Sequence, residues 1–70
     1  MKLKVNVEVY GKVETVEASD EFWLKVMCAL SEAAEYNMEN GYSGAARDCE
    51  RLHDEIYKQT RHEILKMKEN

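Results

Sequence analysis

A strictly alternating segment near the N-terminus limits the fold more than any other feature of the sequence. Residues 3–9 read Leu-Lys-Val-Asn-Val-Glu-Val, with an apolar side chain at every odd position and a polar one between. A period of two is typical of a β-strand with one buried face, and valine fits the pleated surface of a sheet. The segment therefore predicts a strand whose odd-numbered side chains rest on a core.

The glycine that follows this strand predicts a β-hairpin. Gly11 can adopt a positive φ at the first central position of a two-residue loop, so we expect the loop to be residues 11–12. In that register Val7 lies opposite Val16. A loop one residue earlier would place Glu14 opposite Val7, in the middle of the sheet. The burial pattern favours the first register.

Two segments with apolar residues at helical spacing follow the hairpin. Ser19 or Asp20 caps the start of the first, and Gly41 fits the left-handed position after its end. Ser43 fits the N-cap of the second, and the short connection indicates antiparallel neighbours. We therefore predict one α+β domain of ββαα order, with a β-hairpin over residues 3–18 and helices over residues 20–40 and 44–68.

The apolar residues of the helices predict a core and, on the second helix, more apolar surface than the core requires. Trp23 lies well within the apolar stripe of the first helix, and we expect it in the core with Phe22 and Tyr42. The second helix has a broader apolar arc than a helical hairpin on a two-stranded sheet requires, which indicates a partner surface. The residues expected to make self-contacts are Val5, Val7, Tyr57, Ile64 and Leu65.

The small size of the chain and its open sheet favour self-association. A domain of 70 residues has a small core, worth ~3–5 kcal/mol of stability, and the two cysteines lack the spacing of a metal knuckle. A two-stranded sheet leaves unpaired backbone groups at both edges, and the chain has no proline to blunt them. We expect a homodimer in which two hairpins pair across a two-fold axis. Strand addition to another protein would satisfy the same groups.

The charge of the chain narrows the choice of partner. The net charge is −4, and no basic stripe of the kind that binds phosphates is present, so direct nucleic-acid binding is disfavoured. The first helix has an acidic side formed by Glu32, Glu35 and Glu39. We expect these carboxylates, with Tyr36 as an exposed aromatic anchor, to meet a basic protein. A simply solvated helix face is the alternative interpretation.

No motif predicts catalysis, a metal or a cofactor. Cys49, His53 and Tyr57 share one helix face, but we interpret them as a packing seam because Cys28 is expected at the back of its own helix. The three glycines match no phosphate-binding loop. Because no such motif is present, we expect that the chain is not an enzyme. The N-terminus resembles neither a signal peptide nor a membrane span, so we expect a cytoplasmic chain with no membrane contact.

Part of the chain resembles proteins carried by phages. Residues 35–42, Glu-Tyr-Asn-Met-Glu-Asn-Gly-Tyr, followed by Ala-Ala at 45–46 and Glu-Ile-Tyr-Lys at 55–58, resemble the helical hairpins of small accessory proteins from phages and prophages of Gram-positive bacteria. The chain is similar in style to compact acidic inhibitors of bacterial immunity, of the anti-CRISPR type. The resemblance covers residues 20–60 and implies an inhibitor or adaptor without catalytic activity.

These observations lead to one main functional hypothesis and two alternatives. The main hypothesis is a non-catalytic interaction protein that blocks a surface, as a phage-type inhibitor of a bacterial defence or nucleic-acid-handling protein would. The first alternative is a structural subunit of a larger assembly. The second is an oligomer that sequesters a nucleotide at its subunit interfaces, for which the candidate phosphate-binding residues are Lys12, Arg47, Arg51, Lys58 and Arg61.

Overall fold

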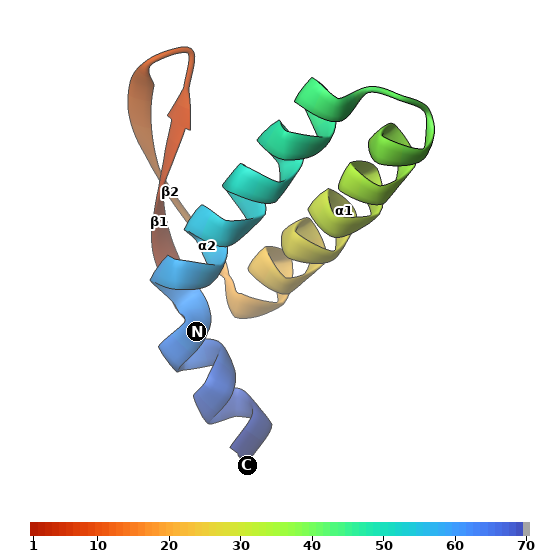
Figure 1. Ribbon diagram of the computed structural model, residues 1–70. Helices are drawn as coiled ribbons and strands as arrows, with labels where there is room; N and C mark the ends of the chain where they lie inside the picture. Colours follow the sequence, from red (N-terminus) through yellow and green to blue (C-terminus); the bar gives the residue numbers. More distant parts are fainter. Residues whose placement is uncertain (70) are drawn as a thin grey trace.

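A β-hairpin followed by a helical hairpin makes up the fold, as the sequence predicts (Figure 1). The computed structural model describes the backbone of residues 1–69, together with the side chains of residues 1–63 and 65. The α+β class and the ββαα order are confirmed. The elements are β1 (Lys2–Val9), β2 (Lys12–Ser19), α1 (Asp20–Glu39) and α2 (Ser43–Glu69).

The loop of the β-hairpin lies one residue earlier than the predicted residues 11–12. Tyr10 and Gly11 form the loop with φ angles of 51° and 78°, as in a type I′ turn. Glu14 consequently lies opposite Val7, so the predicted register was wrong. A two-residue loop that moves by one residue shifts the pairing by two, and every side chain keeps its face. The alternating pattern therefore fits both registers equally, and the turn selects between them.

The two helices begin in different ways, α1 with a side-chain cap and α2 with a backbone hydrogen bond. Ser19 is the N-cap of α1, and its hydroxyl oxygen accepts a hydrogen bond from the N–H of Phe22 at 3.1 Å. At the start of α2, the carbonyl of Tyr42 accepts the bond from the N–H of Ala46 at 3.0 Å. Ser43 is therefore the first residue inside α2 and not its N-cap, which corrects the prediction.

Gly41 ends α1 in the left-handed conformation that the sequence predicts. Its φ is 80°, and its N–H donates to the carbonyl of Met38 at 3.2 Å. The next N–H, of Tyr42, donates to the carbonyl of Asn37 at 2.7 Å. These two bonds form a Schellman motif, which satisfies the last carbonyls of α1 and turns the chain back.

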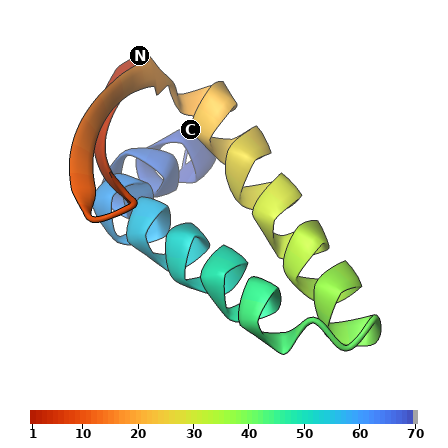
Figure 2. The same ribbon diagram turned by 90° about the horizontal axis from the view of Figure 1, so that it is seen from above.

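The second helix is the central element of the molecule. In Figure 1, α2 lies between the β-hairpin and α1, and Figure 2 shows that α1 and α2 run antiparallel from the turn at one end. The β-hairpin arches over α2 near the middle of that helix (Figure 2). Because α2 packs against two neighbours, it requires the broad apolar arc that its sequence carries.

The core forms where the sheet and both helices meet. Val5 of β1, Trp23 and Met27 of α1, and Ile56 of α2 are buried against one another. The indole N–H of Trp23 donates to the carbonyl of Leu3 at 3.1 Å, so its one polar group is satisfied. The predicted core position of Trp23 is confirmed.

The other two aromatic residues expected in the core lie at the surface. Phe22 is exposed and packs edge-on against Trp23, with the ring centroids 5.4 Å apart. Tyr42 is exposed because its backbone, rather than its ring, completes the turn after α1. The prediction was wrong for both residues. Phe22 is next to Trp23, and only one of two adjacent helical positions can point directly at the core, whereas Tyr42 lies in the turn between the helices.

Candidate binding groove between the helices

A groove follows the seam between α1 and α2. It consists of adjoining hollows of about 420, 270 and 350 Å³. Ser31 lines all three hollows, and Ala34 lines two. Short side chains at these positions of α1 leave room against α2. We call this feature the helical groove, and its lining residues are Leu24, Met27, Cys28, Leu30, Ser31, Glu32, Ala34, Glu35, Met38, Glu39, Glu50, His53, Asp54 and Tyr57.

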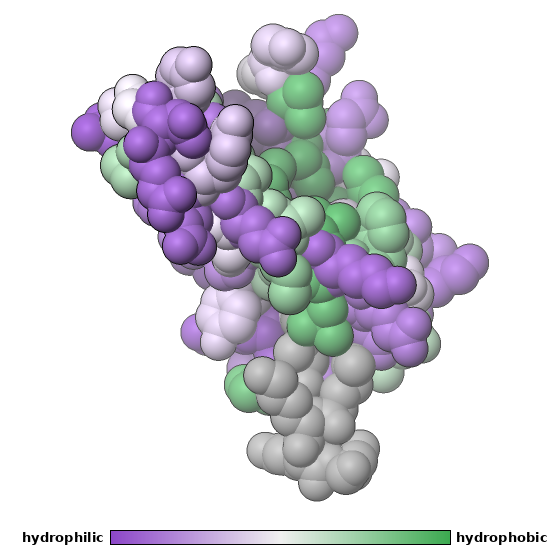
Figure 3. Space-filling model, turned by 90° about the vertical axis from the view of Figure 1, so that its right-hand side faces the viewer, coloured by the Kyte–Doolittle hydropathy of each residue, from purple (hydrophilic) through white to green (hydrophobic). Residues whose placement is uncertain are grey.

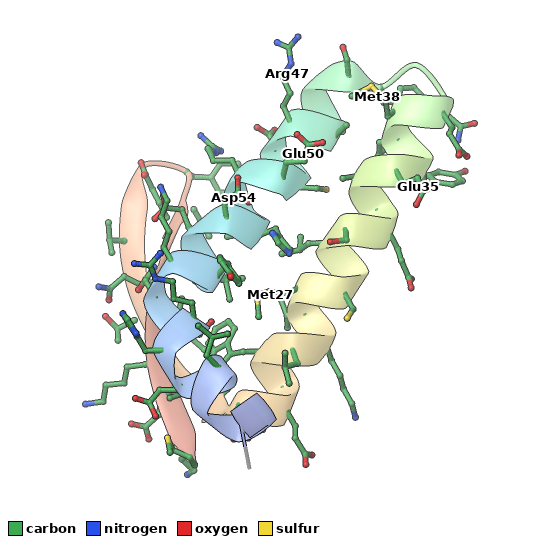
Figure 4. The ribbon with its side chains drawn as sticks, turned by 60° about the horizontal axis from the view of Figure 1, so that its bottom comes forward. Met27, Glu35, Met38, Arg47, Glu50 and Asp54 are labelled. Carbon is green, nitrogen blue, oxygen red and sulfur yellow. The ribbon has the colours of Figure 1, made fainter. Side chains whose placement is uncertain are left out.

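The base of the helical groove is apolar. Met27 lies between the two helices, and Ala34 is buried farther along the same seam (Figure 4). Met38 lines one end of the groove with 51% of its surface exposed, and Tyr57 lines the other end with 45% exposed. Exposed hydrophobic residues also lie between hydrophilic ones on the side where α1 faces the viewer (Figure 3). The groove thus offers unburied apolar surface at both ends.

Carboxylates border the helical groove on both sides. Those on α1 are the three glutamates predicted to meet a partner, and those on α2 are Glu50 and Asp54. No lysine or arginine is among the described side chains that line it. Arg47, near the start of α2, points away from it (Figure 4). A cleft lined by charges of one sign concentrates their potential, so the groove attracts cationic groups.

The sequence identified one border of the groove and missed the other. Glu32, Glu35 and Glu39 recur along one side of α1, which is visible from helical spacing alone. Glu50 and Asp54 lie beside His53, and their role depends on which side of α2 faces α1. Tyr36, the predicted anchor, is exposed but is not among the residues that line the groove.

Of the three residues in the predicted packing seam, Cys49, His53 and Tyr57, the last two are in contact with each other. The rings of His53 and Tyr57 stack, with centroids 6.4 Å apart and planes 6° apart, and Nδ1 of His53 lies 3.3 Å from a carboxylate oxygen of Asp54. Cys49 is half-buried, whereas Cys28 is exposed and lines one end of the groove, not the back of its helix. Across the part of the chain that the structure describes, no three metal-ligating side chains converge.

The residues expected to make self-contacts occupy different environments. Val5 is completely buried by its own chain, and Val7 is half-buried against the same core, so neither strand residue is free for a partner in the way predicted. Tyr57 lines the helical groove, and Leu65 is exposed farther along α2. The side chain of Ile64 lies outside the described residues.

A second hollow separates the tip of the β-hairpin from α2. It has a volume of about 810 Å³ and is lined by both apolar and charged side chains. Arg51, one of the candidate phosphate-binding residues, borders it but lies 3.6 Å from the carboxylate of Asp48. Lys58 likewise lies 3.7 Å from Glu55. Both ion pairs are exposed and join residues of the same helix, so they do not bring the candidate cations together into a phosphate site.

Comparisons with known proteins found no protein similar to this chain. No protein-family model matches the chain, and neither a curated protein nor a solved structure matches it. The resemblance to phage inhibitors stays a prediction. Within residues 1–69, no helix combines the length and the apolar character needed to cross a membrane.

Proposed function

We propose that this chain is a non-catalytic binding protein that acts by covering a basic surface of a protein partner. The observation that carries the proposal is the helical groove, an apolar seam between two rows of carboxylates. Such a groove fits an amphipathic segment that presents apolar side chains flanked by lysine or arginine. Docking of an amphipathic helix into an apolar groove is a recurrent mode of recognition.

The apolar and the charged parts of the groove have separate roles in this proposal. Burial of the exposed ends at Met38 and Tyr57 supplies affinity, because removing the exposed half of such a side chain from water contributes about 1 kcal/mol. The carboxylates accelerate association and reject acidic partners, since rim charges act mainly on the association rate and on specificity. No chemical step is required, and inhibition follows from occupancy of the partner's surface.

The class of partner follows from this charge pattern. A partner surface rich in lysine and arginine is typical of proteins that handle nucleic acid, since these side chains neutralise phosphates. An acidic chain bound there would exclude the nucleic acid. The proposal therefore agrees with what the resemblance to phage inhibitors of bacterial defence implies. It is better supported than nucleotide sequestration, because the described lining of the helical groove includes no lysine or arginine and that of the second hollow includes only Arg51.

A charge-reversal experiment tests the proposal. The probe is a fluorescein-labelled synthetic amphipathic helix of leucine and lysine, and its anisotropy is followed as protein is added. The double variant Glu35→Lys/Glu50→Lys changes one carboxylate on each border of the groove. The matched control, Glu8→Lys/Glu21→Lys, makes the same change in net charge away from the groove.

The two variants give distinct expected results. We expect the groove variant to weaken binding by at least about tenfold, which corresponds to about 1.4 kcal/mol, and the control variant to bind as the wild type does. Circular dichroism checks that both variants keep their helices. Equal binding by the two variants would show that only total charge matters and would reject the groove as the site.

A further inference from the structure

The apolar face of the β-hairpin is only partly covered by its own chain. Val5 of β1 is completely buried, whereas its cross-strand partner, Val16 of β2, is 39% exposed. Every side chain of β2 except Ala18 is exposed. The reason is visible in Figure 1, where α2 lies against β1. Val9 of β1 and Val16 of β2 are therefore the apolar residues of this face that its own chain leaves exposed.

A side chain of α2 occupies the middle of the outer edge of β1. Gln59 accepts a hydrogen bond from the N–H of Asn6 at 2.8 Å and donates one to the carbonyl of the same residue at 3.0 Å. A primary amide bonded in this way takes the place of a neighbouring strand. An incoming strand cannot pair at the middle of β1 without displacing Gln59.

The outer edge of β2 has no such cover. Asn6 directs its backbone groups away from β2, and successive residues of a strand alternate in direction. In β2 the outward-directed residues are therefore Val13, Thr15 and Glu17. The sheet contains only β1 and β2 within residues 1–69, so these N–H and C=O groups pair with no third strand. The β1 edge is thus blocked at its middle, whereas the β2 edge is open.

We propose that β2 pairs with β2 of a second copy of this chain, antiparallel across a two-fold axis. The result is a four-stranded sheet with the two β2 strands at its centre and a β1 strand at each outer edge. Because Gln59 occupies the middle of the β1 edge in each copy, a further strand cannot pair there without displacing it, and the assembly stops at a dimer. The dimer is independent of what the helical groove binds.

Among axes at the central residues of β2, from Glu14 to Glu17, the sequence favours one. An axis at Glu14 or at Glu17 would place two identical carboxylates opposite each other, which is destabilising. An axis at Thr15 would leave each Val16 opposite a glutamate. An axis at Val16 places this half-exposed valine against its own copy, Thr15 opposite Glu17 and Glu14 opposite Ala18. The Val16 axis therefore buries the open apolar surface and opposes no like charges.

A matched pair of proline variants tests the dimer. Lys4 and Glu17 are cross-strand partners, and both direct their N–H groups away from the hairpin. Proline is tolerated at such positions of an edge strand, where its missing N–H costs no bond within the hairpin. Glu17→Pro removes a bond between the copies at each of two symmetric positions, whereas Lys4→Pro alters only the outer edge of β1.

The mass in solution is measured by sedimentation equilibrium over a range of concentrations. We expect the wild-type chain to reach twice its mass of 8.2 kDa and no more. Glu17→Pro should raise the dissociation constant of the dimer by about 30-fold, from two lost hydrogen bonds, and Lys4→Pro should change it by no more than about threefold. A wild-type chain that stays monomeric at millimolar concentration, or equal effects of the two prolines, would overturn the proposal.

Amide hydrogen exchange on the unmodified chain gives a second test that does not depend on either variant folding. The N–H groups of Thr15 and Glu17 should gain protection as the concentration rises, while that of Lys4 should not change. Protection that is independent of concentration at Thr15 and Glu17 would contradict the dimer. Protection that rises at Lys4 in their place would assign the contact to the wrong strand and would also overturn it.

Discussion

The side chain of Gln59 completes the backbone hydrogen bonding of Asn6, although the two residues are 53 positions apart in the sequence. This amide joins the middle of α2 to the middle of β1. The first prediction concerns its removal. Gln59→Ala should lower the free energy of unfolding by about 1 kcal/mol, since it removes two hydrogen bonds to Asn6 and one to the carbonyl of Glu55 at an exposed site. Urea denaturation followed by circular dichroism measures the change.

The same substitution should also open the β1 edge of the sheet. We expect Gln59→Ala to form species larger than a dimer as its concentration rises, because both edges can then pair. Lys58→Ala, at the neighbouring exposed position, is the control and should leave the mass unchanged. If Gln59→Ala and Lys58→Ala showed the same mass distribution, Gln59 would have no role in limiting assembly.

Two glycines at the helical turn should respond in opposite directions to the same substitution. Gly41 has a φ of 80°, whereas Gly44 lies inside α2, and a Cβ added at either position would meet no atom within 4 Å. Gly41→Ala should destabilise the chain by about 1 kcal/mol. The added methyl group causes no clash, but alanine is strained in the left-handed backbone conformation. Gly44→Ala should stabilise it by ~0.4–1 kcal/mol through helix propensity.

Thermal denaturation of the two glycine variants beside the wild type gives this comparison directly. Because neither substitution changes packing, the difference in sign reports the backbone conformation alone. A Gly41→Ala variant as stable as the wild type would show that the Schellman motif after α1 is absent in solution.

The loop of the β-hairpin gives a third prediction. Tyr10 adopts a φ of 51° while its side chain is fully exposed, so the ring contributes no packing that offsets the left-handed conformation. Asparagine tolerates this conformation and is preferred before glycine in type I′ turns. Tyr10→Asn should therefore stabilise the chain by up to about 1 kcal/mol.

Chemical denaturation of Tyr10→Asn and of a Lys12→Asn control tests this expectation. The control places asparagine at the first residue of β2, where a left-handed conformation is not required. A stabilising effect of Lys12→Asn together with a destabilising effect of Tyr10→Asn would favour a loop at residues 11–12 and contradict the observed register.

The contrast between these residues shows what the sequence could and could not predict. Local signals determine the elements: the alternation of residues 3–9 gives the strand, and Gly41 ends the first helix. The register was not predictable from burial, since both alternatives place the same side chains on the same face. Its decisive feature, a tyrosine with positive φ, has no sequence signal, because bulky residues rarely adopt that conformation.

The candidate site also has a part that the sequence predicted and a part that it did not. The glutamates on α1 follow from helical spacing, but Glu50 and Asp54 enter the site only because the packing of α2 turns them toward α1. The open edge of the sheet was predicted for both strands and is found on one. Gln59 blocks the middle of the other through a contact between distant residues, which no local pattern reveals.

The last prediction tests the helical groove by filling it. Ser31 is exposed and lines each of the adjoining hollows, so a larger side chain there occupies the groove without displacing a core residue. Ser31→Trp should weaken binding of the leucine–lysine peptide by at least about tenfold, because the indole and the peptide cannot share the same space. Ala29→Trp places the same ring on another exposed position of α1 and should bind as the wild type does. Anisotropy titrations of both variants measure the difference. Because neither substitution changes the net charge, a loss confined to Ser31→Trp would separate the shape of the groove from its charge, and equal affinities would show that the peptide binds elsewhere.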